Sequence, residues 1–143
     1  MSAEQVFSIA NGIALAGWLM LLFAGGRGRS VALRVTGAII PLLFAVLYTG
    51  LLFTHWHTAE GGFTSLKDVK LLFANEWLLL AGWVHYLAFD LFVGSWQVRD
   101  ARQCQIPHWM LAPSLVLTFL FGPAGLLVYF LMRTLRLRGT QLQ

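Results

Sequence analysis

Apolar residues fall into four blocks of about 20 residues, and short polar segments separate them. Each block is long enough to cross a bilayer as a helix. The blocks are residues 6–24, 35–53, 77–96 and 111–132. Backbone groups in hydrocarbon must be hydrogen-bonded within the segment, and the alternating pattern of a barrel strand does not occur. The pattern therefore predicts an all-α, polytopic membrane protein, a single domain over residues 1–143 with a bundle of four transmembrane helices.

Composition supports this class, because 58% of the residues are hydrophobic and only 11% are charged, against about 25% charged in ordinary soluble domains. The mean hydropathy is +0.71. The net charge of +4 comes from basic residues beside the block ends. Their expected partner is the headgroup region of the lipid bilayer, and no nucleic acid is expected. The first block follows a segment without Lys or Arg, so we expect a retained span rather than a secretory signal.

The segment between the second and third blocks predicts a short amphipathic helix. Ser65 is followed three residues later by Asp68, which resembles a capping box. Apolar residues then recur at helical spacing through Phe73, as in a helix that lies in the membrane interface. We expect this helix to lead into the third span.

Two blocks contain proline. Pro41 should kink the second span and open space at mid-membrane. In the fourth block, Gly122 and Pro123 favour either a kinked spanning helix or a helix that turns back as a re-entrant element. The kinked helix is the commoner structure, so we expect four full spans.

The distribution of Lys and Arg bears on this choice. With four full spans, each side of the membrane carries five basic residues, and the absence of Lys and Arg before the first block then places both termini outside the cytoplasm. A re-entrant fourth block would move Arg133, Arg136 and Arg138 to the side of the other basic loops, so the two counts would no longer be equal. The two sets are Arg27, Arg29, Arg34, Arg99 and Arg102 on one side and Lys67, Lys70, Arg133, Arg136 and Arg138 on the other.

The third block carries ionisable side chains that are rare in a transmembrane segment. Glu76 lies at its start, and His85 and Asp90 lie inside it. An Asp at the centre of a spanning helix costs about 2.5 to 3.5 kcal/mol on the insertion scale, so such residues usually face a protein partner, a cavity or a substrate path. These three residues are the catalytic candidates.

Helical geometry predicts which of these side chains share a face. Glu76, Trp83, Asp90 and Gln97 are seven residues apart and form one stripe. His85 lies about 140° around the helix from Asp90, so the two must find partners on different helices. The alternative to catalysis is that these residues only tie helices together. Polar partners for such ties are Asn11, Thr36, Tyr48, Thr49, Ser114, Thr118 and Tyr129.

Aromatic residues near these positions are candidates for a ligand site. An indole beside an ionisable residue can line a slot for a flat or polyene ligand, although packing would also explain each of these rings. The ligand-binding candidates are Trp83, Trp18, Phe92 and Tyr86. Cys104 is the only cysteine, and no Cys or His spacing resembles a zinc site, so we expect no metal. Phosphate loops and dinucleotide fingerprints are also missing from the sequence.

Several motifs together resemble the abscisic acid-deficient four family of small integral membrane proteins. They are Asn75-Glu76-Trp77, Trp83-Val84-His85, Phe89-Asp90-Leu91-Phe92, Arg99-Asp100, Ile106-Pro107 and residues 117–125. Plant members of this family are needed to make neoxanthin from violaxanthin. The resemblance implies a hydrophobic carotenoid or related isoprenoid as the ligand. Because no Ser- and Arg-rich transit segment precedes the first block, we expect a multi-pass protein of the bacterial inner (cytoplasmic) membrane.

The most specific activity that this resemblance implies is isomerisation of a carotenoid epoxide to an allenic alcohol. This reaction is redox-neutral and needs an acid for the epoxide oxygen and a base for a carbon-bound proton, so no cofactor is expected. Asp90 is the candidate acid, and His85 or Glu76 is the candidate base.

Two other classes stay open. The first is a non-catalytic carotenoid-binding, scaffold or assembly protein, with Trp18, Trp83 and Phe92 in an apolar slot. The second is a small transporter that uses Glu76 and Asp90, which would have to form a homo-oligomer because the chain is short and lacks an inverted repeat.

Overall fold

The computed structural model describes residues 1–23 and 29–140, and within these ranges it is helical, with no strand. This confirms the predicted all-α class. The helices are α1 (Ala3–Phe23), α2 (Arg29–Arg34), α3 (Ile40–His55), α4 (Leu66–Leu72), α5 (Glu76–Gln103), α6 (His108–Phe121) and α7 (Pro123–Thr140). A π-helical turn, Val35–Ile39, joins α2 to α3, and a 3₁₀ turn, Trp56–Thr58, follows α3.

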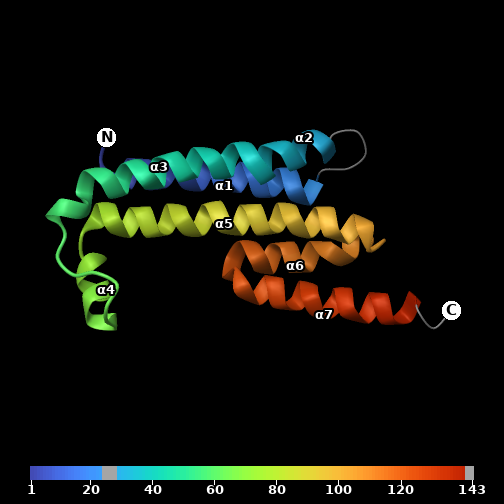
Figure 1. Ribbon diagram of the computed structural model, residues 1–143. Helices are drawn as coiled ribbons and strands as arrows, with labels where there is room; N and C mark the ends of the chain where they lie inside the picture. Colours follow the sequence, from blue (N-terminus) through green and yellow to red (C-terminus); the bar gives the residue numbers. More distant parts are fainter. Residues whose placement is uncertain (24–28, 141–143) are drawn as a thin grey trace.

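Helix α5 is the centre of the bundle (Figure 1). Its 28 residues extend over about 42 Å, and it packs against α1, α3 and α6. Leu91 and Val84 on α5 are completely buried between these neighbours. Buried alanines and glycines at the α1 and α5 contacts bring the helices close together, as is usual in membrane bundles.

Within residues 1–23 and 29–140, three continuous helical segments are long and apolar enough to cross a membrane: Ala3–Phe23, Arg29–Thr58 and Glu76–Gln103. They correspond to the first three predicted blocks. Ala24, the predicted end of the first span, and Arg27 lie outside the described residues. The chain is therefore a multi-pass membrane protein.

The fourth block is not the single spanning helix that we expected. It divides at Gly122 into α6 and α7, which pack side by side as a hairpin (Figure 1). Gly122 has φ +46°, which L side chains rarely adopt, and Pro123 begins the next helix without an N–H group. Gly125 then permits close approach, because a Cβ there would lie 2.1 Å from the backbone nitrogen of Thr118. The turn between α6 and α7 therefore reverses the chain instead of kinking it.

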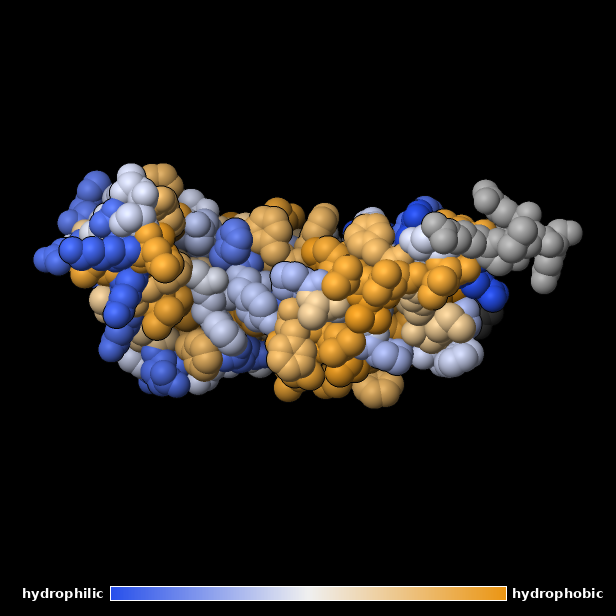
Figure 2. All heavy atoms as spheres, turned by 90° about the horizontal axis from the view of Figure 1, so that it is seen from below, coloured by the Kyte–Doolittle hydropathy of each residue, from blue (hydrophilic) through white to orange (hydrophobic). Residues whose placement is uncertain are grey.

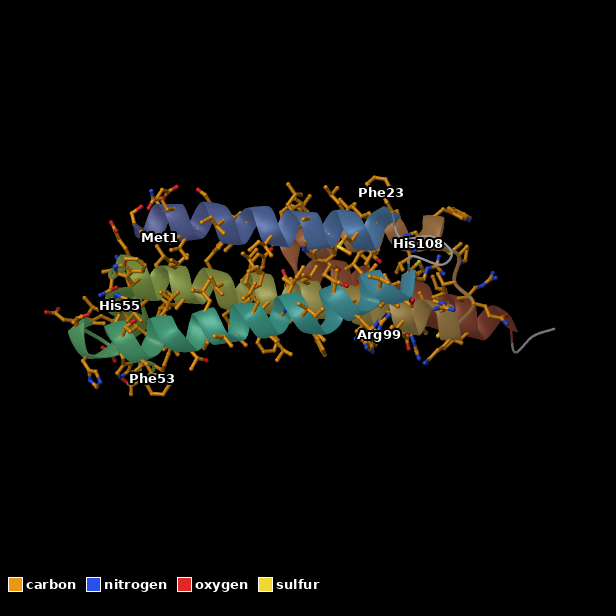
Figure 3. All side chains as sticks on the ribbon, turned by 90° about the horizontal axis from the view of Figure 1, so that it is seen from above. Met1, Phe23, Phe53, His55, Arg99 and His108 are labelled. Carbon is orange, nitrogen blue, oxygen red and sulfur yellow. The ribbon has the colours of Figure 1, made fainter. Side chains whose placement is uncertain are left out.

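The hairpin corrects the expected topology as well. Helix α6 has 14 residues, about 21 Å, and therefore reaches only about halfway along α5. Because the chain then turns back, α7 ends at the opposite end of the molecule from the start of α1 (Figure 1). The start of α1 and the end of α7 are thus not on the same side. Arginines of α2, α5 and α7 gather at the end of the bundle that Arg99 and His108 mark in Figure 3, whereas Lys67 and Lys70 of α4 lie at the other.

We expected a kink at Pro41, and the irregularity that the structure shows in this region is the π-helical turn Val35–Ile39, which ends two residues before it. The N–H of Ile40 donates to the carbonyl of Val35, five residues earlier, and Thr36 Oγ1 donates to the carbonyl of Ala32 at 2.7 Å. Single π turns of this kind often mark functional sites in helices.

Helix α4 confirms the predicted amphipathic helix before α5. The backbone N–H of Asp68 donates to Ser65 Oγ at 3.1 Å, which is half of the expected capping box. The Asp68 carboxylate instead accepts a hydrogen bond from Thr64 Oγ1, which lowers the pKa of Asp68 below its ordinary value. Leu66 and Phe63 remain exposed, as expected for a segment that lies in the membrane interface.

Candidate functional site

The polar stripe of α5 faces α1 near one end and the α6–α7 hairpin further along. Trp83 Nε1 donates to Asn11 Oδ1 on α1 at 2.9 Å, and Gln97 Nε2 donates to Thr118 Oγ1 on α6 at 3.0 Å. Figure 2, seen from below, shows a paler band between the apolar surface of the hairpin and the end that carries α4. The predicted polar stripe on α5 therefore supplies hydrogen bonds between helices.

Asp90 lies where the hairpin turns. Its Oδ2 is buried and has no hydrogen-bond partner among the described residues. The carboxylate packs against Gly122, directly before the N-terminus of α7, where the helix dipole favours a negative charge. Tyr86 is the neighbouring polar side chain, and its hydroxyl donates to the carbonyl of Phe119 at 3.3 Å. Asp90 and Tyr86 thus meet the tip of the hairpin from α5.

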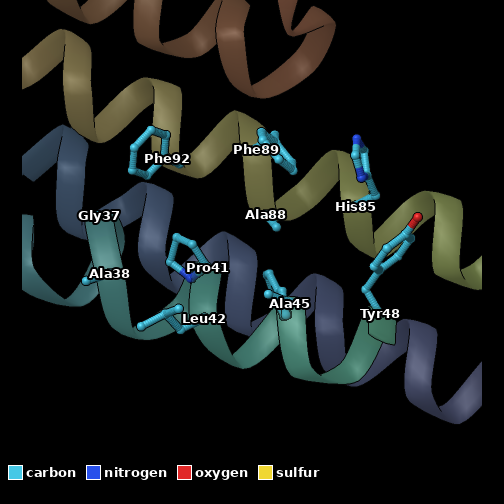
Figure 4. A pocket seen from close by; sticks show the side chains of 11 residues that line it. Gly37, Ala38, Pro41, Leu42, Ala45, Tyr48, His85, Ala88, Phe89 and Phe92 are labelled. Carbon is cyan, nitrogen blue, oxygen red and sulfur yellow. The ribbon is translucent and has the colours of Figure 1, made fainter. Parts of the chain in front are cut away.

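His85 points to a different face of α5, into a groove between α3 and α5 (Figure 4). We call it the α3–α5 groove; its volume is about 610 Å³. The small side chains Ala38, Ala45 and Ala88 leave this space open, and it begins within the π-helical turn. The lining residues are Gly37, Ala38, Pro41, Leu42, Phe44, Ala45, Tyr48, His85, Ala88, Phe89 and Phe92.

Tyr48 and His85 are the polar side chains of this groove, and they lie together at one end of it (Figure 4). Their ring centroids are 5.5 Å apart, and the His85 ring also packs on Phe89 at 4.6 Å. In the part of the chain that the structure describes, neither side chain makes a hydrogen bond to protein. Two hydrogen-bonding groups in an otherwise apolar wall are suited to hold an oxygen atom of a ligand.

The catalytic candidates are not brought together. His85 faces α3, and Asp90 faces the hairpin, as the predicted angle between them requires. Glu76 is exposed at the start of α5, in a third place, and lines a pocket of about 470 Å³ with Glu4, Phe7 and Trp83. One atom of a ligand therefore cannot meet all three residues in this arrangement.

The ligand-binding candidates separate in the same way. Phe92 lines the α3–α5 groove, Trp83 lines the pocket beside Glu76, and Tyr86 faces the hairpin. Trp18 is only 2% exposed, and its ring fills the space above Gly94, where a Cβ would lie 2.6 Å from the indole. Its ring centroid is 5.6 Å from that of Phe119. The position of Trp18 is that of a core residue between α1, α5 and α6.

One polar cluster was missed from the sequence. Arg133 Nε donates to Asp100 Oδ2 at 2.7 Å, and the Tyr129 hydroxyl donates to the same oxygen at 2.5 Å. These contacts join α7 to the end of α5. The separations of 33 and 29 residues carry no periodic signal, so only the hairpin brings the three side chains together. Tyr48 was noted as a polar partner, but its place beside His85 was not predicted.

Among the described residues, no three His, Cys, Asp or Glu side chains are arranged to hold a metal ion.

The chain is similar to one known protein family. The family model described as ABA DEFICIENT 4-like matches residues 5–129, which is most of the chain. The chain belongs to the ABA4-like family. No curated protein and no solved structure matches it. The resemblance seen in the sequence is thus confirmed, and Trp83, His85, Tyr86 and Asp90 all lie within the range that the family model matches.

Proposed function

We propose that this ABA4-like protein binds a carotenoid or a related isoprenoid in the α3–α5 groove. The observation that carries the proposal is the groove itself: about 610 Å³, apolar along its length, with Tyr48 and His85 at one end. A hydrocarbon chain gains contact area along such a wall, and the two polar side chains fix its position by an oxygen atom.

The lipid-facing position of the groove supports an isoprenoid ligand. Phe92, Phe89 and Leu42 at its edges are about half exposed, so the groove opens sideways toward lipid. A hydrophobic ligand dissolved in the bilayer reaches such a site without crossing water. The small lining residues Gly37, Ala38, Ala45 and Ala88 leave room along the groove for an extended polyene chain.

If the protein is an enzyme, the acid and the base of the reaction both lie in the α3–α5 groove. The Tyr48 hydroxyl gives its proton to an epoxide oxygen as the C–O bond breaks, and His85 removes a proton from carbon as the new double bond forms. His85 then returns the proton to Tyr48, so the reaction is a balanced isomerisation. Asp90, which we expected to be the acid, faces the hairpin instead and would act only on a ligand bound elsewhere.

The test is pigment analysis of the protein purified from a carotenoid-producing host. Ala45→Phe fills the groove and should reduce the bound pigment per protein by at least about tenfold. Val46→Phe is the matched control, because Val46 is the next residue on α3 and is 73% exposed toward lipid. Equal pigment in both variants would exclude the groove as the site.

Conversion is measured in the same membranes. If the protein is an enzyme, a new isomer should be present with the wild type and missing with His85→Ala and Tyr48→Phe. Bound but unconverted pigment in the wild type would support the non-catalytic binder or scaffold and exclude the isomerase.

A further inference from the structure

Two arginines continue the lining of the α3–α5 groove beyond Gly37, toward the end of the bundle that Arg99 marks in Figure 3. We call it the arginine-rich end. Arg34 lies one helical turn before Ala38, which lines the groove from the α3 side. Arg99 lies two helical turns after Phe92 on α5, so the two share a face of that helix. The apolar wall on each side of the groove therefore gives way to an arginine.

The Arg99 side chain crosses from α5 to the π-helical turn. A Cβ at Gly37 would lie 3.1 Å from Arg99 Nη2 and 2.5 Å from Ser95 Oγ, so the guanidinium lies over the mouth of the groove. Ser95 Oγ also donates to the carbonyl of Leu33, the residue before Arg34, at 3.5 Å. This contact fixes how α2 packs against α5, and so the separation of the two arginines.

Neither arginine is paired within the described part of the chain. Both residues are exposed, and within residues 1–23 and 29–140 neither guanidinium makes a hydrogen bond or an ion pair. Asp100 is the one acidic residue described at this end of the bundle, and Arg133 and Tyr129 already bind its carboxylate. The positive charge at the mouth of the groove is therefore available to a partner outside the chain.

The two arginines lie at the depth of the lipid phosphates. Each is within about one and a half turns of an end of its spanning segment, Arg29–Thr58 for Arg34 and Glu76–Gln103 for Arg99. The groove itself opens sideways toward lipid, so an acyl chain of the bilayer reaches it without leaving hydrocarbon. Basic pockets between spanning helices are typical binding sites for anionic head groups.

We infer that the mouth of the α3–α5 groove is a binding site for an anionic phospholipid. The lipid phosphate lies between Arg34 and Arg99, whose guanidinium groups donate paired hydrogen bonds to its oxygens, and one acyl chain enters the groove past Gly37. A zwitterionic lipid brings a cation of its own beside the two arginines, so the site selects a head group with net negative charge. The inference does not depend on the proposed function, because it needs the mouth of the groove and not Tyr48 and His85 at its other end.

The experiment measures binding of phosphatidylglycerol and phosphatidylcholine with identical acyl chains to the full chain in detergent, by native mass spectrometry. The wild type should bind phosphatidylglycerol at least about fivefold more tightly than phosphatidylcholine. Arg34→Gln and Arg99→Gln should each reduce this preference to about twofold or less. Because both side chains are exposed and make no hydrogen bond to the described residues, neither substitution should disturb the fold.

Arg102→Gln is the matched control for charge. Arg102 is also exposed near the end of α5, but it lies about 60° around the helix from Arg99, so its loss should keep the preference. Ala45→Phe fills the groove and should weaken phosphatidylglycerol binding by at least about fivefold, whereas Val46→Phe on the lipid-facing side should not. Glycerol phosphate, which has a phosphate head group without acyl chains, should not displace the lipid even in large excess.

Three results would overturn the site. Equal loss of preference in Arg102→Gln and Arg99→Gln would mean that lipid is attracted diffusely to the whole arginine-rich end. An unchanged preference in Arg34→Gln and Arg99→Gln, or unchanged binding in Ala45→Phe, would exclude these residues from the site. Displacement by glycerol phosphate would indicate a soluble phosphate ligand instead of a lipid. Pigment binding is measured separately, so each of these results leaves the proposed function intact.

Discussion

The carboxylate of Asp90 packs directly against the α-carbon of Gly122: a Cβ at Gly122 would lie 2.9 Å from Asp90 Oδ2. This contact places an acidic side chain of a spanning helix at the turn of the α6–α7 hairpin, beside the N-terminus of α7. The dipole of α7 and the lack of a side chain at residue 122 together explain how the bundle accommodates the carboxylate.

Gly122→Ala should destabilise the protein. The backbone at Gly122 has φ +46° and ψ −98°, outside the left-handed helical region, so an L residue costs more there than the about 1–2 kcal/mol of that region, and the new methyl group would press on Asp90. We expect a lower midpoint of thermal unfolding in detergent. Gly12→Ala is the control, because a Cβ at Gly12 meets nothing, and it should be neutral or slightly stabilising. Equal midpoints for the two variants would contradict the strained turn.

Asp90→Asn and His85→Ala should have different effects because the two side chains face different helices. Asp90→Asn should leave pigment binding in the α3–α5 groove within about twofold of wild type, because Asp90 packs against the hairpin and not in the groove. His85→Ala should weaken binding with little effect on stability. A loss of pigment in Asp90→Asn, with the fold preserved, would place the ligand beside the hairpin instead.

Gln97 and Thr118 should be energetically coupled. Both are completely buried, and they hydrogen-bond across α5 and α6 at 3.0 Å. A double-mutant cycle with Gln97→Leu and Thr118→Val should give a coupling of about 0.6 kcal/mol and at most about 1.7 kcal/mol, as measured for such bonds in membrane bundles. Thr49→Val, on the exposed face of α3, provides the comparison outside the interface. Strict additivity would mean that this bond does not hold the hairpin to α5.

The arginine-rich end of the bundle should face the cytoplasm, with the start of α1 on the other side. The hairpin puts Arg133 at the same end as Arg34, Arg99 and Arg102, and the positive-inside rule then favours this orientation. Cys104 is at this end and is partly exposed, so a membrane-impermeant maleimide should label it only after the cells are opened. Glu60→Cys in a Cys104→Ser background should be labelled in intact cells. The reverse labelling pattern would invert the topology.

The sequence predicts the helices well because each spanning block is a local property of composition and length. The helical repeat also predicts correctly that His85 and Asp90 diverge, because that angle depends only on α5. It does not predict that Tyr48 meets His85, since that contact joins two helices, and no pattern within α3 or α5 alone reveals how they pack.

The fourth block shows a different limit. Gly-Pro is compatible with both a kink and a reversal, and the choice depends on contacts that only the folded chain makes: Gly125 against Thr118, and Arg133 with Asp100. The position of Trp18 has the same cause. Its burial depends on Gly94 of another helix, and no pattern within α1 reveals it.

The half-length hairpin also affects the bilayer around the protein. At the arginine-rich end, α6 and α7 lie beside the three spanning helices, whereas beyond the tip of the hairpin the spanning helices continue without them (Figure 1). Among the helices that lie along the spanning bundle, the cross-section of the protein is therefore larger at the arginine-rich end than beyond the tip of the hairpin. Such a wedge fits best in a curved membrane, so the chain should concentrate where the leaflet at the arginine-rich end is stretched.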